Sequence, residues 1–450
     1  MNDRDHGFVK QPVVHRALRW LATVIVYGSY RSVEVKRPEA DYSQRPVIVV
    51  ANHFAGFADP VLFFYGVARR PRFLAKATLW DNPAVARVLD FAGAIPVHRA
   101  TDGSTEGNVD IFKACHDVLK DREVIALFPE GTTHDDAAIA PIKTGAARIA
   151  LGARAAGASD IIIVPVGIHY EDKAGFRSRV FGEVGEVIDL DQMIDEYVAS
   201  GEEATTENRE AVRRLTADID LKLRAVSPDY RSAAEWNALG GAAEVALRSR
   251  KYDPSEPLSY GEREEMANRL SGFPPEVGDA VVAAVTEYRD TLRERGLRDE
   301  AVAAYARVSG APPDHATRGL LGALGLAPTA IAGLIVNAVP MAVMAAIRQV
   351  NVAPVTMATI RTLAAPVVYT VSWAAWASFL GRRFGRLGRT AAWGSGVIGG
   401  WASILAVERV ALVARAWLGW RKARLTPDLP AVIEARRRVV DTVEHALAKG

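Results

Sequence analysis

Between residues 45 and 170 the sequence alternates short runs rich in strand-forming residues with longer stretches of helical spacing. Strands are predicted at residues 47–50, 73–76, 94–97, 124–128 and 161–166, and helices at 61–68, 109–120 and 143–156. A chain that alternates in this way folds with its helices covering the faces of one sheet. The region is therefore predicted to be an α/β domain with a central mixed sheet flanked by helices.

The sequence changes character twice after this region. Residues 171–318 hold one more predicted strand, at 180–188, and then charged segments with amphipathic helical spacing, as at 207–226 and 275–297. After Arg318 the runs 319–347, 362–380 and 390–407 contain no charged residue. Uncharged runs of about 18 residues or more are candidate membrane spans. Because these runs are rich in Ala and Gly, buried helices or hairpins within one leaflet remain alternatives.

Basic residues border the apolar segments. The uncharged segment 20–30 has arginines on both sides and is too short to span a bilayer of ~30 Å, so a buried helix or one lying on the membrane surface is expected. The arginine-dense segment 382–389 lies between two uncharged runs, and such loops normally stay cytoplasmic. The expected organisation is as follows: 1–44 an N-terminal apolar helix, 45–200 the α/β domain, 201–318 a charged helical region, 319–425 a hydrophobic membrane-associated region, and 426–450 a C-terminal helix.

Composition excludes several classes of protein. The net charge is only +2 and no long run of Lys and Arg occurs, so nucleic acid is not an expected partner. Cys115 is the only cysteine, so no internal disulfide can form, and no Cys/His grouping has zinc spacing. No metal site, P-loop or Gly-rich dinucleotide turn is expected. The first residues lack the pattern of a secretory signal, and a reducing, cytoplasmic setting is expected for the soluble part.

The strongest chemical signal directly follows the first predicted strand, at Asn52-His53 and Asp59-Pro60. Asp59 is predicted at the N-cap of the next helix, with Pro60 in the first helical position. A carboxylate beside an imidazole fixes one ring nitrogen, and the other nitrogen can then take a proton as general base. On their own, however, such residues more often cap a helix and end a strand.

Polar residues also follow three other predicted strands. Lys76 ends one strand, Arg99 follows a second, and Glu130-Gly131 follow a third. Reactive groups gather at the carboxyl ends of strands in an α/β sheet, so these residues are expected at the same edge as His53. Arg99 is suited to bind a phosphate through two hydrogen bonds, and Lys76 would add a point charge. Gly131 would let the backbone approach a ligand closely.

Four ordered blocks of the sequence resemble the motifs of the glycerolipid acyltransferase superfamily. That family includes the glycerol-3-phosphate and 1-acylglycerol-3-phosphate acyltransferases. The blocks are Asn-His with a later Asp at 52–59, Gly-Ala-Ile-Pro-Val-His-Arg at 93–99, Phe-Pro-Glu-Gly-Thr at 128–132 and Val-Pro-Val at 164–166. Their order and spacing match the family over about residues 15–190.

The resemblance implies both a site and a donor. His53 with Asp59 would be the catalytic base, while Arg99, Glu130 and Gly131 would bind the acceptor. The acyl donor would be acyl-CoA or acyl-carrier protein, used as a co-substrate, and no other cofactor is implied.

Two departures from the family pattern narrow the resemblance. Five residues separate His53 from Asp59, where most members have four, and Thr133 stands where the third block usually has an arginine. Together with residues 141–147, these departures look like the branch typified by eukaryotic glycerol-3-phosphate and dihydroxyacetone-phosphate acyltransferases. That branch also carries C-terminal hydrophobic segments. Lys143 is the candidate for the phosphate contact that the missing arginine leaves open.

These features predict a membrane enzyme with its catalytic domain facing the cytoplasm. It would move a fatty acyl group onto the hydroxyl of glycerol 3-phosphate or 1-acylglycerol 3-phosphate in phospholipid biosynthesis. Its partners would be membrane lipids, the glycerol phosphate acceptor and the acyl donor. Direct transfer is expected, because no Gly-x-Ser-x-Gly motif occurs and Cys115 falls within a predicted helix. Two alternatives remain open: acyl transfer between lipids or to another lipid alcohol, and a non-catalytic lipid-binding membrane protein that keeps the fold.

Overall fold

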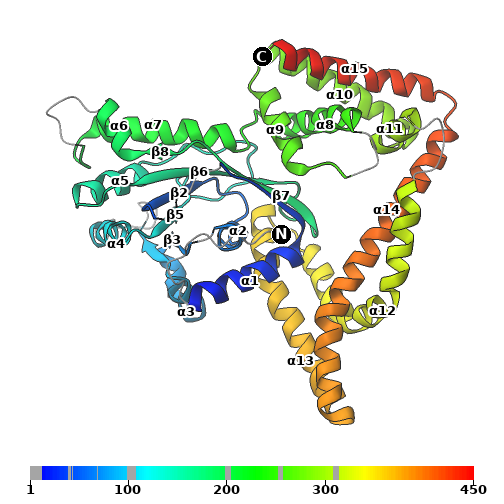
Figure 1. Cartoon of the computed structure of the whole chain (residues 1–450), viewed down its shortest axis with the longest axis horizontal. Helices are drawn as coiled ribbons and strands as arrows, with labels where there is room; N and C mark the ends of the chain where they lie inside the picture. The colour runs from blue at the N-terminus through cyan, green and yellow to red at the C-terminus, as the bar shows by residue number, and fades with distance from the viewer. Residues whose placement is uncertain are drawn as a thin grey trace. The chain divides into compact units, whose positions relative to one another are not determined.

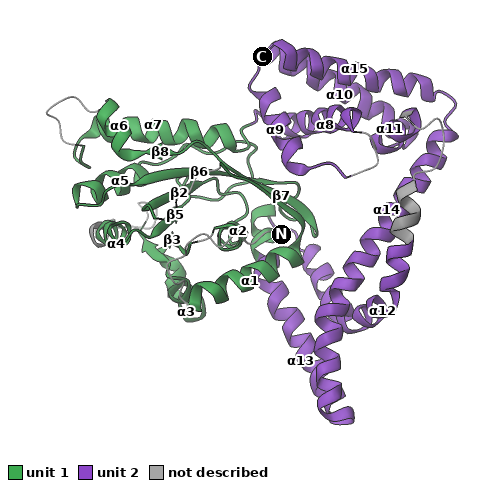
Figure 2. Ribbon diagram, viewed as in Figure 1, with its two compact units in different colours: residues 1–229, 353–359 green, residues 230–352, 360–450 purple. Residues whose placement is uncertain are grey.

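The computed structural model describes residues 13–38, 42, 44–67, 69–98, 108–197, 204–251, 257–307 and 314–449. The chain divides into two compact units (Figure 2). Unit 1 comprises Met1–Asp229 with Ala353–Thr359, and unit 2 comprises Tyr230–Val352 with Ile360–Gly450. The sheet lies in unit 1, and the three uncharged runs lie in unit 2.

Unit 1 is built around an eight-stranded sheet in the order β1-β7-β6-β2-β5-β3-β4, with β8 paired to β6. The strands are β1 (Tyr30–Lys36), β2 (Val47–Ala51), β3 (Pro71–Lys76), β4 (Ile95–Val97), β5 (Val124–Leu127), β6 (Ile162–Tyr170), β7 (Ser178–Val184) and β8 (Ile188–Asp189). The strands from β6 to β4 in this order are parallel, whereas β7 and β8 run antiparallel to β6. The predicted mixed α/β sheet is confirmed, and five carboxyl strand ends meet at one edge.

Helices cover both faces of the sheet (Figure 1). They are α1 (Val13–Ser29), α2 (Ala58–Gly66), η1 (Ala77–Asp81), α3 (Pro83–Ala92), α4 (Asn108–Lys120), α5 (Gly145–Ala155), α6 (Leu190–Tyr197) and α7 (Arg209–Val226). Val47 and Val49 of β2 pack into the core on the side of α1 and α2, while Ile48 and Val50 pack into the core beneath α4, α5 and α7. This alternation, apolar on both sides, is what a strand buried on two faces requires.

The N-terminal part of unit 1 departs from the prediction. Helix α1 contains most of the apolar segment 20–30, and it buries Val26 while leaving Trp20 and Val24 exposed. The residues after it form β1, a strand that was not predicted, paired in parallel with β7. Its sequence Tyr-Arg-Ser-Val-Glu-Val-Lys is short and rich in charge, so its strand signal is weak without the partner strand.

Unit 1 extends to Asp229, beyond the residue 200 at which the α/β domain was expected to end. The reason is α7, whose Leu215 and Ile219 are buried in the core under the sheet. At its end the helix approaches β6 so closely that a Cβ on Gly167 would lie 1.7 Å from the Val226 carbonyl oxygen. The charged helical region expected at 201–318 is therefore shared between the two units.

Unit 2 consists of helices. The charged helices α8 (Ala233–Arg250), α9 (Tyr260–Ser271), α10 (Pro275–Arg295) and α11 (Asp299–Arg307) pack with the C-terminal helix α15 (Leu429–Lys449). Partly buried polar groups join these helices: Asp299 accepts hydrogen bonds from the Tyr288 hydroxyl (2.9 Å) and from Arg436 Nε (2.7 Å). Three distant parts of the sequence, in α10, α11 and α15, are thereby fixed to one another.

The remaining helices of unit 2 are long and apolar: α12 (Asp314–Arg348), α13 (Pro354–Gly394) and α14 (Gly400–Arg424), the last two joined by the π-helical turn η3 (Ser395–Gly399). Among the described residues, two stretches are long and apolar enough to cross a membrane: Leu321–Arg348, with mean hydropathy 2.2, and Pro354–Arg424, with mean hydropathy 1.7. The second folds back at Gly385 (φ 60°, ψ −138°), and the ribbon turns back on itself there (Figure 1). Trp373 then packs against Trp393, with ring centroids 5.9 Å apart. These helices indicate a membrane location.

Asn337 ties the apolar helices together. It is 2% exposed, its Nδ2 donates to the carbonyl oxygens of Gly333 (2.9 Å) and Gly396 (3.1 Å), and its Oδ1 accepts from Trp373 Nε1 (2.8 Å). An amide among apolar side chains is costly unless its hydrogen bonds are satisfied. Asn337 therefore fixes how α12 lies against the hairpin formed by α13 and α14.

Candidate active site

The site begins at Asn52, where β2 ends. This side chain is completely buried and bridges to β6: Nδ2 donates to the Ile168 carbonyl oxygen (2.9 Å), and Oδ1 accepts from the Ile168 N–H (2.7 Å). A buried amide needs such partners, and these two bonds continue the pairing of β2 with β6 beyond Ala51. Asn52 thereby places His53 at the carboxyl edge of the sheet.

The imidazole of His53 is bound by protein at Nδ1 and is open at Nε2. Its Nδ1 lies 2.8 Å from Asp59 Oδ2, and its ring stacks on Phe128 with centroids 3.9 Å apart and an interplanar angle of 7°. The side chain is 15% exposed. Nε2 has no hydrogen-bond partner among the described residues. With Nδ1–H donating to Asp59, Nε2 is the atom that can take a proton from a substrate.

Asp59 is completely buried and lies in the first turn of α2, so its prediction as an N-cap residue is wrong. The helix begins at Ala58 with Phe57 in the N-cap position, because the loop turns early: the Ala58 N–H donates to the Ala55 carbonyl oxygen (3.1 Å). The Asp59 carboxylate points back across this loop. Its Oδ2 accepts from the Ala55 N–H (2.9 Å) as well as from the ring of His53.

Tyr170, the last residue of β6, completes this chain of hydrogen bonds and was missed by the sequence analysis. Its hydroxyl donates to Asp59 Oδ1. Burial, together with the negative charge of Asp59, raises the pKa of Tyr170 well above its usual range, so the phenol remains a protonated donor at neutral pH. No sequence signal pointed to it, because the predicted strand 161–166 ended four residues earlier, whereas β6 extends to Tyr170. A tyrosine there is also an ordinary core residue.

Glu130, which follows β5, is 2% exposed and is held entirely by protein groups. Its Oε1 accepts from the His53 backbone N–H (2.7 Å), and its Oε2 accepts from the Ala140 N–H (2.8 Å) and from Nε2 of His134. The carboxylate thus joins the loop after β5 to the loop that carries the base. Because β2 and β5 are neighbouring parallel strands, the predicted nearness of His53 and Glu130 is found in the structure.

Gly131 and Lys143 lie directly against each other. Gly131 has φ +68°, and a Cβ on it would lie 2.5 Å from Lys143 Nζ. The backbone N–H of Lys143 donates to the Pro129 carbonyl oxygen (2.8 Å), which brings the two parts of the loop together. The ammonium group of Lys143 is therefore positioned over the turn that carries Glu130, and its contact with a phosphate remains a prediction.

The other cations near this edge are placed as follows. Lys76 closes β3 and is half-buried, whereas Arg99 lies outside the described residues. Lys173, which was not predicted, forms an ion pair with Asp135 (2.7 Å), and its Nζ lies 5.6 Å from the centroid of the Phe54 ring. In the part of the chain that the structure describes, no three His, Cys, Asp or Glu side chains gather as ligands for a metal ion.

The loop between His53 and Asp59 is also held by Thr359, 302 residues beyond the loop residue that it contacts. Thr359 lies in the first turns of α13, in the short segment that belongs to unit 1. Its Oγ1 accepts from the Phe57 N–H (3.1 Å), and a Cβ on Gly56, which has φ +57°, would lie 2.3 Å from that oxygen. The start of α13 thus packs on the loop between His53 and Asp59, which we call the catalytic loop. No local sequence pattern predicts this contact.

Part of the chain matches known acyltransferases. Residues 32–169 match the family model described as Acyltransferase. Glycerol-3-phosphate O-acyltransferase 2 of Saccharomyces cerevisiae is 38% identical over 127 residues, 27% of this chain and 16% of that protein. Glycerol-3-phosphate O-acyltransferase 1 of the same yeast is 33% identical over 118 residues, 26% of this chain and 15% of that protein. The chloroplastic 1-acyl-sn-glycerol-3-phosphate acyltransferase BAT2 of Brassica napus is 26% identical over 136 residues, 30% of this chain and 38% of that protein.

The matched residues lie in unit 1 and include His53, Asp59 and Glu130 at one edge of the sheet. Unit 1 thus contains the part of the chain that matches the Acyltransferase family model. This part of the chain is similar to glycerolipid acyltransferases, as the sequence motifs implied. Its matches cover less than two fifths of the length of each of these curated relatives.

Proposed function

We propose that the protein transfers a fatty acyl group to the hydroxyl of glycerol 3-phosphate or 1-acylglycerol 3-phosphate, with His53 as general base. The observation that carries this proposal is the chain from Tyr170 through Asp59 to His53. A buried carboxylate orients the imidazole at Nδ1, while Nε2 has no partner among the described residues. A hydroxyl is a poor nucleophile, so a base held in this way supplies what acyl transfer requires.

The proton balance of the reaction follows from this geometry. His53 Nε2 takes the proton of the acceptor hydroxyl as the oxygen attacks the thioester carbonyl carbon. The tetrahedral intermediate collapses when its C–S bond breaks, and the imidazolium returns the proton to the leaving thiolate. Asp59 stabilises the imidazolium between these two steps. The products are an ester and a thiol, and His53 ends the cycle neutral.

Cations around the catalytic loop suit the phosphate of the acceptor. Lys143 is the first of these, because its ammonium group lies over Gly131 beside the loop that holds His53. Lys76 and Arg99 are the further proposed contacts. Glu130 was predicted to bind the acceptor, but both of its oxygens already accept hydrogen bonds from protein groups. We therefore assign it the role of positioning the backbone of the base.

A basic groove beside the loop that follows Glu130 suits the acyl donor. It has a volume of about 470 Å³ and is lined by Pro141, Ile142, Thr144, Arg148, Arg209, Val212, Arg213, Thr216, Ala217, Asp220 and Arg224. Arg224 Nη1 donates to the Ile139 carbonyl oxygen (3.4 Å), next to the residue that binds Glu130. Arg148 and Arg209 have no carboxylate within ion-pair distance among the described residues. Because guanidinium groups bind phosphate well, we assign this groove to the phosphates of acyl-CoA.

This assignment is tested by comparing two acyl donors, acyl-CoA and acyl-pantetheine, of which only the first carries the nucleotide phosphates. The double variant Arg148→Ala/Arg209→Ala is expected to raise KM for acyl-CoA roughly tenfold, the effect of losing one or two charge-assisted hydrogen bonds. Its kcat/KM for acyl-pantetheine, which lacks the nucleotide phosphates, is expected to stay at the wild-type value. An unchanged KM for acyl-CoA would remove the groove from the donor site.

The function itself is tested with purified full-length protein and labelled substrates. Acyl-CoA with glycerol 3-phosphate should give 1-acylglycerol 3-phosphate, and acyl-CoA with 1-acylglycerol 3-phosphate should give the diacyl product. The ratio of the two kcat/KM values identifies the preferred acceptor. Acylation of a lysophospholipid without any thioester donor would instead indicate transfer between lipids. A complete absence of acyl transfer would leave only the non-catalytic lipid-binding alternative.

A further inference from the structure

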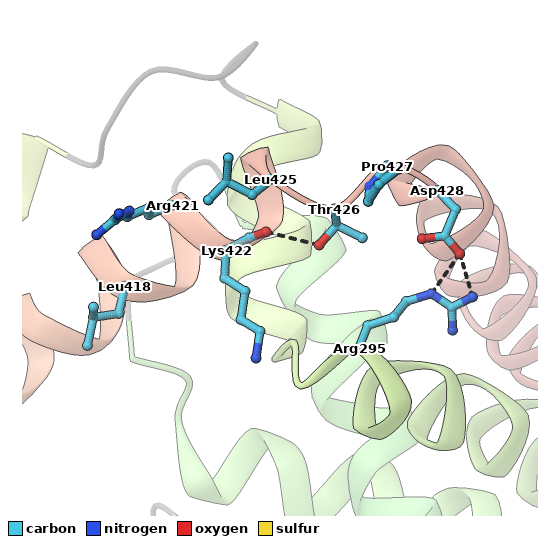
Figure 3. Close-up of a pocket in the computed structure, with 8 residues that line it drawn as sticks. All are labelled: Arg295, Leu418, Arg421, Lys422, Leu425, Thr426, Pro427 and Asp428. Carbon is cyan, nitrogen blue, oxygen red and sulfur yellow. Dashed lines mark hydrogen bonds and ion pairs between the residues drawn. The ribbon is translucent and has the colours of Figure 1, made fainter.

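Unit 2 has a cavity of about 590 Å³ at the C-terminal end of α14 (Figure 3). Its walls come from the last turns of α14, the link between α14 and α15, and the end of α10. The lining residues are Arg295, Leu418, Arg421, Lys422, Leu425, Thr426, Pro427 and Asp428. The cavity therefore lies where Pro354–Arg424, the longer of the two stretches apolar enough to cross a membrane, comes to its end.

The cavity carries cations without matching acidic groups. Arg295 is neutralised by Asp428, with Nε 2.8 Å from Oδ2 (Figure 3). Arg421 and Lys422 have no carboxylate within ion-pair distance among the described residues. Lys422 Nζ instead lies against the backbone, 2.4 Å from where a Cβ on Gly296 would be. Two positive charges thus face this space uncompensated, and an anion would neutralise them.

Apolar side chains border the same cavity and are open to the surroundings. Leu418 is 56% exposed and Leu425 is 69% exposed. Trp417, which is 48% exposed, lies beside Arg421, whose guanidinium carbon is 5.8 Å from its ring centroid. Tryptophan with Arg and Lys at the end of an apolar helix is the composition typical of the membrane–water interface.

We propose that this cavity binds an anionic glycerophospholipid. Its phosphate would lie between Arg421 and Lys422, and an acyl chain would lie along Leu418 and Leu425. Further exposed apolar side chains of α14 precede the cavity, at Val407, Val410 and Leu412. A free phosphate ion would contact the two cations only, and it would make no contact with the two leucines. The cavity belongs to unit 2, so its occupancy is separate from the acyltransferase chemistry of unit 1.

Binding is tested on purified full-length protein in a neutral detergent, with dihexanoyl phosphatidate as the anionic probe and dihexanoyl phosphatidylcholine as the neutral one. Isothermal titration calorimetry should show saturable binding of the anionic probe. In the double variant Arg421→Gln/Lys422→Gln its affinity should fall at least tenfold. The matched control is Arg437→Gln/Arg438→Gln, which removes two charges from exposed ion pairs on α15 and should keep wild-type affinity.

A second variant separates a lipid from a free anion. Leu418→Asn/Leu425→Asn keeps both cations, so it should weaken phosphatidate binding severalfold without changing the weak affinity for inorganic phosphate. The proposal is overturned if the neutral lipid binds as well as the anionic one, or if the Arg421/Lys422 variant keeps wild-type affinity. It is equally overturned if inorganic phosphate binds as tightly as phosphatidate and the leucine variant behaves as wild type. Circular dichroism confirms that each variant is folded.

Discussion

At the scale of single residues, the buried carboxylate of Asp59 organises the site. An ionised carboxylate without solvent contact needs hydrogen bonds to both of its oxygens. Here the Ala55 N–H and the His53 ring bind Oδ2, and the Tyr170 hydroxyl binds Oδ1. With all three donors in place, Asp59 remains fixed in the orientation that directs His53 Nε2 toward substrate. The loss of one donor should therefore reduce activity before it affects the fold.

The variant Tyr170→Phe removes one hydrogen bond to a charged group and keeps the aromatic ring. Such a bond contributes about 1.5–3 kcal/mol, so kcat should fall roughly tenfold or more. KM for the acceptor should change little, because Tyr170 is buried behind Asp59 and does not face the open side of His53. Steady-state kinetics with both substrates measures this separation of kcat from KM.

Tyr230→Phe is the matched control. Tyr230 is a buried tyrosine of unit 2 whose hydroxyl donates to Asn268 Oδ1 (2.6 Å), so its loss is a comparable structural change away from the site. It should leave kcat at the wild-type value. Full activity in folded Tyr170→Phe would show that Asp59 does not depend on this donor.

The sequence predicted some site residues and not others for a physical reason. His53 and Glu130 each follow a strand, and adjacent parallel strands bring their ends together whatever the details of the loops. Asp59 was placed correctly near His53 but wrongly as a helix cap, since the fold of the five-residue loop decides where α2 begins. Lys173 and Tyr170 reach the site through the pairing of β6 with β2 and the loop beyond it, which only the tertiary structure determines.

At the scale of elements, the start of α13 supports the catalytic loop. Ala358 is buried in the same core as Phe54 and Ala58, so the first turns of this helix are part of unit 1. The Thr359 hydroxyl oxygen accepts a hydrogen bond from the Phe57 N–H, in the loop between His53 and Asp59. This loop is thus supported by a residue from the C-terminal half of the chain.

Thr359→Val replaces the hydroxyl with a methyl group of similar shape and leaves the Phe57 N–H without its acceptor. The cost of one such bond is about 0.5–1.5 kcal/mol, so kcat should fall roughly two- to tenfold. Thr359→Ser keeps the acceptor and should retain most of the activity. Equal activity in the Val and Ser variants would mean that the contact is packing alone.

Elements with a strong local pattern were predicted well, and elements that depend on partners were not. The strands β2 and β5 are continuous apolar runs, and their predicted positions agree with the structure within one residue. Strand β1 was missed because its charged sequence becomes a strand only beside β7. The arginine-dense loop at 382–389 was predicted between two uncharged runs, and the break at Gly385 within it is where the chain folds back.

At the scale of the whole molecule, the hairpin of α13 and α14 determines how the chain meets the membrane. The uncharged runs 362–380 and 390–407 flank the arginine turn at 382–389. At ~1.5 Å per residue each run is roughly 27–29 Å long, close to the ~30 Å thickness of the hydrocarbon core. A hairpin that crosses the membrane would therefore carry its arginine turn to the face opposite the start of α13.

If the runs 362–380 and 390–407 each cross the membrane, two expectations from the sequence conflict. The arginine turn and the catalytic domain were both expected to face the cytoplasm, yet α13 begins in unit 1 and reaches that turn only after the uncharged run 362–380. We propose that the catalytic unit lies on the cytoplasmic side, because glycerol 3-phosphate and acyl-CoA, two of its proposed substrates, are charged. The arginine turn is then expected on the opposite face, where its side chains can reach lipid phosphates.

Cysteine labelling in cells tests this arrangement. The native Cys115 is buried, and burial raises its pKa to about 12, so it should react slowly with maleimides. A membrane-impermeant maleimide should label Arg383→Cys, in the turn, on intact cells. It should label Asp121→Cys, on the surface of unit 1, only after permeabilisation. Labelling of both positions only after permeabilisation would mean that the hairpin does not cross.

The central claim is that His53 takes the proton of the acceptor hydroxyl, and a single-turnover measurement tests it most directly. Full-length wild type and His53→Ala are each mixed with labelled acyl-CoA and glycerol 3-phosphate, and the rate of ester formation is measured. Removal of the base should lower this rate at least ~10²-fold while the unfolding temperature and acyl-CoA binding stay near wild type. A His53→Ala protein that forms the ester at a rate comparable to wild type would contradict the account.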